Sequence, residues 1–111
     1  MVVSKTELFD EALQKKANLF KALAHPARLQ ILQFLSETKT CISGDISEEL
    51  PLSRTTVNQH LKELKDAGLI CGHFEGVKMN YCLDYQKVDE MKTLLGSFLN
   101  EFQIPDDFCC K

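Results

Sequence analysis

The chain has 111 residues, 44% hydrophobic and 26% charged, with a formal net charge of −3. This length fits one globular domain and excludes two. The longest apolar stretches contain only a few residues, which excludes a membrane-spanning helix. The start of the chain, MVVSKTELFD, lacks the charged and then apolar layout of a signal peptide, so we expect a cytoplasmic protein. The negative charge argues against non-specific coating of nucleic acid, but it permits a local basic element that reads DNA.

Apolar residues at helical spacing predict two helices in the first third of the chain. The first contains the apolar residues from Leu8 to Leu23. The second begins at Pro26, which suits the first turn of a helix, and continues to about Ser36. The polar residues 38–42 are expected to form a loop or a short extended piece. Ser43 can then cap a short third helix that ends before Pro51.

The fourth predicted helix has the clearest boundaries. Ser53 is a favourable N-cap, and Leu52 and Val57 flank it at the spacing of a hydrophobic staple. An apolar stripe that begins at Val57 predicts the buried side of this helix. Gly68 follows as a C-terminal stop.

Residues 69–83 alternate with a period of two, which predicts a β-hairpin with Glu75-Gly76 as its turn. Helical spacing returns from Tyr85 to Phe102, and Pro105 ends the last helix. We therefore expect a folded domain over residues 1–104 and a flexible tail over residues 105–111. The predicted fold is mainly α with a β-hairpin wing, in the order α-α-α-α-β-β-α. A short helix, a tight turn, a capped helix and a following hairpin together form a winged helix-turn-helix.

The polar side of the fourth helix predicts a DNA contact surface. Around Thr55, hydroxyl, amide and cationic groups lie opposite the apolar stripe, and residues 53–65 carry three basic side chains and one glutamate. Such groups bind base edges and phosphates. An ordinary solvated helix face is the alternative. The predicted DNA-binding residues are Ser53, Arg54, Thr55, Thr56, Asn58, Gln59, His60 and Lys62 on the helix, and Lys78 with His73 on the wing, where Glu75 would repel phosphate.

Five segments carry recognisable motifs: residues 22–29 (ALAHPARL), 45–53 (DISEELPLS), 57–64 (VNQHLKEL), 67–70 (AGLI) and 81–83 (YCL). In this order they closely resemble the ArsR/SmtB family of winged-helix repressors, over a region from about Leu19 to Leu83. The resemblance implies a homodimer, paired through its first and last helices, that binds operator double-stranded DNA until an effector releases it. It also implies operator contacts from residues 53–62 and a mainly architectural role for His25, Pro26 and Arg28.

The last predicted helix gives an independent reason to expect a homodimer. It offers more apolar side chains than one face of a small domain needs, unless all of them pack within the monomer. A symmetric dimer also suits palindromic half-sites about one DNA turn apart, roughly 34–36 Å. These side chains are Met91, Leu94, Leu95, Phe98 and Leu99.

Five cysteines in a reducing compartment indicate metal ligands, redox thiols or small buried groups rather than a disulfide framework. Adjacent Cys109 and Cys110 can chelate one centre, and trivalent arsenic or antimony takes three thiolates. Resemblance to the family, which often carries thiolates at the start of its third helix, favours Cys41 as the third ligand. The Cys-x-Cys pair of arsenic-sensing members is missing here, and the tail cysteines could instead be inert. The last helix contains no histidine, so a zinc site there lacks nitrogen ligands, and thiolates prefer soft ions.

The hairpin carries a rival pair of thiols. With Glu75-Gly76 as the turn, Cys71 faces Asn80, so Cys71 and Cys82 are diagonal neighbours on one face. The pair could bind a metal or oxidise to a disulfide, and the simpler alternative is that both residues pack on the domain.

These patterns predict a transcriptional repressor, not an enzyme, with no permanent cofactor. We expect a thiophilic ion to release it from DNA. The favoured effector is trivalent arsenic (arsenite or an organoarsenical) or antimony. The same fold responding to cadmium, lead or zinc, or acting as a thiol redox switch, is an alternative. A third hypothesis is an enzyme or arsenic carrier that uses the adjacent thiols without DNA. The sequence shows no nucleophile–base pair, phosphate loop or carboxylate dyad that would support catalysis.

Overall fold

The computed structural model describes residues 5–38, 42–43 and 50–106. The predicted order of helices around a β-hairpin is confirmed. The short third helix expected after Ser43 falls on residues 44–49, which lie outside the described residues. The elements are η1 (Lys5–Leu8, a 3-10 helix), α1 (Glu11–Leu23), α2 (Pro26–Thr38), β1 (Ile42–Ser43), α3 (Arg54–Asp66), β2 (Ile70–Glu75), β3 (Lys78–Leu83) and α4 (Tyr85–Asn100).

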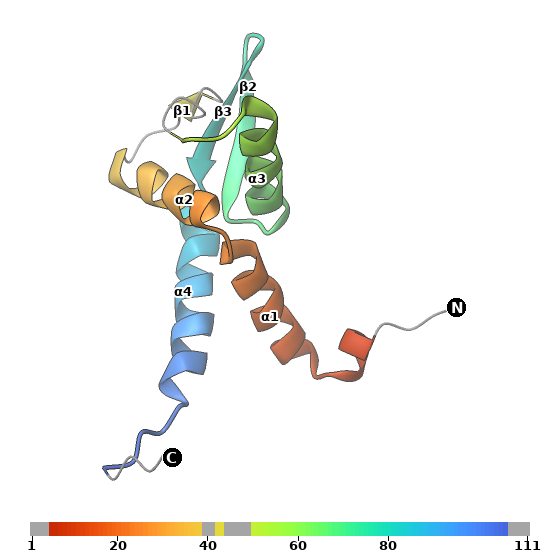
Figure 1. Cartoon of the computed structure of the whole chain (residues 1–111), viewed down its shortest axis with the longest axis vertical. Coiled ribbons are helices and arrows are strands. Elements are labelled where there is room, and N and C mark those ends of the chain that lie inside the picture. The colour runs from red at the N-terminus through yellow and green to blue at the C-terminus, as the bar shows by residue number, and fades with distance from the viewer. Residues whose placement is uncertain (1–4, 39–41, 44–49, 107–111) are drawn as a thin grey trace.

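The β2–β3 hairpin and the far ends of α1 and α4 lie at opposite ends of the molecule (Figure 1). The β2–β3 hairpin projects at one end with α3 packed beside it, and α1 and α4 run toward the other end. The α2 helix lies between these two groups. Within the described ranges, no helix combines the length and apolar character that crossing a bilayer requires.

Local side-chain interactions set the ends of α3 and α4. The Ser53 hydroxyl accepts a hydrogen bond from the Thr56 N–H, at 3.3 Å, which satisfies one of the donors that a helix start leaves unpaired. Gly68 follows the C-cap residue Ala67 of α3 and adopts φ of 82°, a conformation that glycine reaches without strain. The Asp84 carboxylate accepts from the Lys87 N–H at 3.1 Å and caps α4 in the same way. The predicted N-cap and stop of the fourth helix are therefore confirmed.

The hydrophobic core lies where α1, α2, α3 and the base of the hairpin meet. The stripe on α3 (Val57, Leu61 and Leu64) is fully buried. Ile31 from α2 and Ile70 from β2 belong to the same core. Burial of an apolar side chain of this size contributes about 1.5–3 kcal/mol. The core therefore fixes which side of α3 faces inward, and leaves the other side to solvent.

Two side chains close the junction between α1 and α2. The His25 Nδ1 atom accepts a hydrogen bond from the Ala27 N–H at 3.0 Å, at the start of α2. The Arg28 guanidinium donates to the Ala22 carbonyl oxygen at 3.1 Å, and also to that of Lys21, at the end of α1. These contacts join the two helices, which is the kind of role that the family resemblance implied for His25 and Arg28.

The sheet has three strands in the order β1-β3-β2. The hairpin register differs from the predicted one, because Glu75 pairs with Lys78 and the two loop residues are Gly76 and Val77. Gly76 has φ of 66°, and a tight two-residue hairpin turn requires positive φ at its first loop position. Consequently Cys71 faces Cys82 directly and not Asn80, so the diagonal placement of these thiols was wrong.

Candidate nucleic-acid interface

The outward side of α3 is polar and open to solvent. Ser53 and the helix residues Arg54, Thr55, Asn58, Gln59 and Lys62 are all exposed. Thr56 is half-buried, and its hydroxyl lies 3.0 Å from that of Ser53. Eight sequence-predicted residues start or line this helix, and seven of them are thus at least partly accessible. The core buries the opposite side of the helix, so these exposed polar groups face solvent, where an external partner can reach them.

His60 is the exception on this helix. Only 9% of the residue is exposed, and its ring centroid lies 4.1 Å from that of His25. The prediction that His60 contacts DNA is therefore wrong in this structure, because the α1–α2 junction packs over that flank of α3. Burial lowers the pKa of His60. The neighbouring His25 and Arg28 lower this pKa further, and Glu63 raises it. The fold therefore favours the neutral imidazole at this position.

Lys62 has an intramolecular partner that the sequence analysis missed. Its Nζ atom lies 3.3 Å from the Asp66 carboxylate, and both side chains are well exposed. The spacing i, i+4 was a visible signal for such a pair. An exposed ion pair of this kind contributes only about 0–1 kcal/mol, so a phosphate can replace the carboxylate at little cost.

The wing carries one predicted cation near its tip. Lys78 is exposed and pairs across the hairpin with Glu75, whose carboxylate accepts a hydrogen bond from the Asn80 amide. His73 is also exposed and faces Asn80. No sequence signal singled out the apolar tip, where Phe74 is 71% and Val77 97% exposed. The wing therefore presents one lysine, one glutamate and an uncovered apolar tip.

The cysteines divide into two groups. Cys41, Cys109 and Cys110, the predicted ligands, lie outside the described residues. Cys71 is free and exposed, so it is not bonded to Cys82, which is half-buried. Residues 5–38, 42–43 and 50–106 contain no cluster of three or more side chains suited to hold a metal ion.

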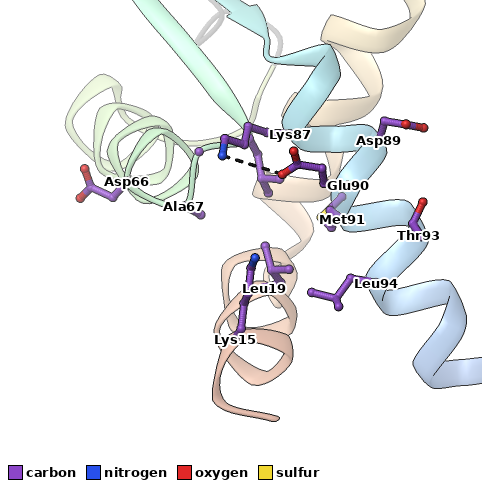
Figure 2. A pocket seen from close by; sticks show the side chains of 12 residues that line it. Lys15, Leu19, Asp66, Ala67, Lys87, Asp89, Glu90, Met91, Thr93 and Leu94 are labelled. Atoms are coloured by element: carbon purple, nitrogen blue, oxygen red, sulfur yellow. Dashed lines mark ion pairs between the residues drawn. The ribbon is translucent and has the colours of Figure 1, made fainter. Parts of the chain in front are cut away.

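A cavity of about 530 Å³ lies between α1, the end of α3 and α4 (Figure 2). Leu19 from α1 and Met91 and Leu94 from α4 line it. Charged groups also line it, among them the ion pair between Lys87 and Glu90, whose Nζ and Oε2 atoms lie 3.8 Å apart. Asp66 and Ala67 at the end of α3 also line it.

Comparisons with known proteins agree with this architecture. Residues 25–71 match the family described as "Bacterial regulatory protein, arsR family". An uncharacterised HTH-type transcriptional regulator of Methanocaldococcus jannaschii is 34% identical over 85 residues, 77% of this chain and 96% of that protein. The transcriptional repressor SdpR of Bacillus subtilis is 31% identical over 84 residues, 76% of this chain and 92% of SdpR.

A solved structure described as a "possible transcriptional regulator for arsenical resistance" is also similar. It superposes with a TM-score of 0.64 at 30% identity, and the match covers 70% of this chain and 80% of that one. The match to the arsR family spans α2, α3 and the start of β2, which together carry the exposed polar side described above.

Proposed function

We propose that this chain, which belongs to the arsR family of bacterial regulatory proteins, is a repressor that a thiophilic ion releases from operator DNA. It would act as a homodimer in the cytoplasm. The relatives are transcriptional regulators, so the expectation that the chain is not an enzyme is confirmed. The observation that carries the proposal is the exposed polar side of α3 on a helix-turn-helix scaffold.

The α3 helix supplies the reading surface. Asn58 and Gln59 offer amide groups of the kind that pair with adenine edges in the major groove, and Arg54 offers a guanidinium suited to guanine or phosphate. Lys62 lies one turn further along the helix, where it would bind a phosphate in place of Asp66. Lys78 would add a phosphate contact from the wing.

Apolar residues on α1 and α4, and beside their outer ends, support the homodimer. Leu13 is 46% and Leu99 52% exposed, and Phe9 and Phe102 are each 62% exposed. A second cavity of about 400 Å³ lies among α1 side chains and Phe98. A lone soluble domain rarely leaves so many large apolar side chains uncovered in one region. A second copy of the chain, packed through the same two helices, would cover them symmetrically.

The effector proposal rests on the chemistry of the cysteines. Cys109 and Cys110 are adjacent in the sequence, and Cys41 precedes the helix-turn-helix. Three thiolates suit trivalent arsenic, supplied as arsenite or an organoarsenical, or antimony, and cadmium, lead or zinc are alternatives. The similarity to a possible transcriptional regulator for arsenical resistance supports arsenic as the favoured effector. The ion must bind the free dimer more tightly than the DNA-bound dimer, typically by about 1–3 kcal/mol.

The DNA half of the proposal is tested with duplexes selected from a random pool by the full-length chain. Replacing Asn58, Gln59 and Lys62 by alanine should abolish binding, while Gln33→Ala with Ser36→Ala, both exposed on α2, should not. Lys62→Ala alone should lower the slope of log affinity against log salt by about one phosphate contact. Equal binding by the triple variant and the wild type would refute a DNA-reading role for α3.

The effector half is tested by adding arsenite to the preformed complex and measuring the released DNA. Cys109→Ser with Cys110→Ser should leave DNA affinity unchanged and abolish release by arsenite. Antimonite, cadmium, lead and zinc are compared in the same assay. Release that persists in the double variant would exclude the tail thiols and leave Cys71 and Cys82 as the remaining candidates.

A further inference from the structure

The cavity between α1, the end of α3 and α4 has the size of a small-molecule site. Its volume is about 530 Å³, within the range of about 300–1,000 Å³ that is usual for ligand pockets. Leu19 from α1 and Met91 and Leu94 from α4 form an apolar wall, and all three are half-buried. Leu69, which is buried in the core, also lines the cavity. A ligand that fits this wall therefore has an apolar body.

One positive charge at this cavity has no partner within the described ranges. The Lys15 side chain is directed toward the cavity (Figure 2), and no described carboxylate pairs with its ammonium group. The other charged groups of the lining are paired or point elsewhere. Lys87 pairs with Glu90, Asp66 pairs with a lysine of α3, and the Asp89 carboxylate points away from the cavity (Figure 2). The uncompensated charge is positive, so it complements an anionic head group.

The cavity lies on a different side of α1 from the apolar surface proposed for the homodimer. At about 100° per residue, Leu19 lies roughly 40° around α1 from Lys15, whereas Leu13 and Phe20 lie roughly 140–160° from Lys15. Leu13 and Phe20 line the second cavity together with Phe98, and the end of α3 takes no part in that cavity. A second copy that covers Leu13 therefore leaves room for a small ligand between α1, α3 and α4.

We propose that this cavity binds an amphipathic carboxylate, an anionic head group on an apolar chain. The Lys15 ammonium group donates charge-assisted hydrogen bonds to the carboxylate oxygens. The chain lies against Leu19, Met91 and Leu94 and is removed from water there. The bound molecule connects α1, the end of α3 and α4 at one point. This site uses neither a cysteine nor a residue of the proposed DNA surface, so it goes beyond the proposed function and can be tested without DNA.

NMR of isotope-labelled methionine methyl groups in the full-length chain tests the site, with decanoate as the probe. Met91 lies in the cavity wall, Met79 on β3 is the internal reference, and the Met91→Leu spectrum assigns the Met91 signal. Decanoate should shift the Met91 signal until it saturates and leave the Met79 signal unchanged. Decanol, which has the same chain without the charge, should bind at least about tenfold more weakly. A Met91 signal that does not respond to decanoate would refute the proposal.

Two matched lysine variants test the contact with the head group. Lys15→Gln should weaken decanoate binding at least about tenfold, because the carboxylate loses its charged donor. Lys16→Gln removes the same charge from the neighbouring residue, whose Nζ atom lies 5.6 Å from the centroid of the Phe98 ring. This control should change the affinity by less than about twofold, because solvent and salt screen charges outside the site. Equal weakening by both variants would indicate general attraction of anions and contradict the site. A Met91 signal that moves with protein concentration alone would show that a second copy fills the cavity, which would also overturn the proposal.

Discussion

The imidazole of His60 joins the helix that carries the polar surface to the junction between α1 and α2. Its ring lies against that of His25, which in turn caps α2 through the Ala27 N–H. The pKa of His60 is lowered by burial, then by His25 and by Arg28, while Glu63 raises it. The fold therefore favours the neutral imidazole, and an unfolded chain binds a proton at this position more readily.

We predict that this histidine makes the fold sensitive to acid. Its stabilising contribution is complete above the unfolded pKa of about 6.5 and is lost as the pH falls from there through the lower folded value. Urea unfolding of the wild type and of His60→Leu between about pH 5 and 8 measures this contribution. The difference in unfolding free energy between the wild type and His60→Leu should shrink toward acid pH. Parallel curves for the two proteins would show that His60 does not titrate on unfolding.

The burial of His60 could not be read from the helical pattern alone. Counting from Thr55, the residue lies roughly 140° around α3, on the flank between the polar side and the apolar stripe. Which way such a flanking residue faces depends on the neighbouring helix that covers it. Here the neighbour is His25, 35 positions earlier in the chain (60 − 25), so the decisive contact is tertiary. The exposure of Asn58 and Lys62, which fall within roughly 60° of Thr55 on the polar side, was predictable.

Among the elements, α3 has the most complete set of local sequence signals. Ser53 caps its first turn, three apolar side chains fill its inner side, and Gly68 ends it with a positive φ. Each of these signals acts over a few residues, which is why the boundaries of this helix could be predicted from the sequence. The cap also lies at the edge of the proposed DNA surface, so its stabilising and binding roles can be separated.

We predict that Ser53→Ala lowers the free energy of unfolding by about 1 kcal/mol, because the Thr56 N–H loses its acceptor. Ser53→Asp keeps an acceptor and should preserve the stability seen in urea unfolding. The added negative charge should nevertheless weaken DNA binding, because it lies beside the surface proposed for phosphates. If Ser53→Asp bound DNA as tightly as the wild type, the start of α3 would lie outside the DNA contact.

The hairpin shows where local signals are insufficient. A turn at Glu75-Gly76 and a turn at Gly76-Val77 place the same residues on the same two faces, so the alternation of the strands does not distinguish them. The cross-strand pairs decide the matter, since Ile70 meets Leu83 in the core and Glu75 meets Lys78 near the tip. The faces were therefore predictable, but the direct opposition of Cys71 and Cys82 was not.

At the scale of the whole molecule, the described chain leaves one end poorly covered. The α1 and α4 helices diverge from the core toward the same end (Figure 1). Phe20 and Phe98 connect them with ring centroids 5.8 Å apart, yet large apolar side chains beyond this contact remain exposed. The excess of apolar residues on the last helix was visible in the sequence. The share of this apolar surface that the monomer itself buries could not be predicted, because it depends on tertiary packing. In the structure Leu95 is the buried residue of α4.

We predict that Leu99→Asp, at a residue 52% exposed in the monomer, converts a dimer into a monomer without unfolding it. Sedimentation equilibrium measures the mass, and circular dichroism checks the helix content. Val77→Asp is the matched control, because this residue is 97% exposed but lies at the wing tip. It should leave the mass of the dimer unchanged. An unchanged mass for Leu99→Asp would place the contact between copies elsewhere.

The closed junction between α1 and α2 has a mechanical consequence. Ala24 and His25 alone separate the two helices, and hydrogen bonds from Arg28 and to His25 fix both helix ends. A displacement of α1 therefore carries α2 with it, and the His25–His60 contact extends the coupling to α3. In the proposed homodimer, a small rotation between subunits would thus change the spacing and tilt of the two α3 helices without altering either helix. Rigid-body reorientation, without melting any helix, would be enough to end operator recognition.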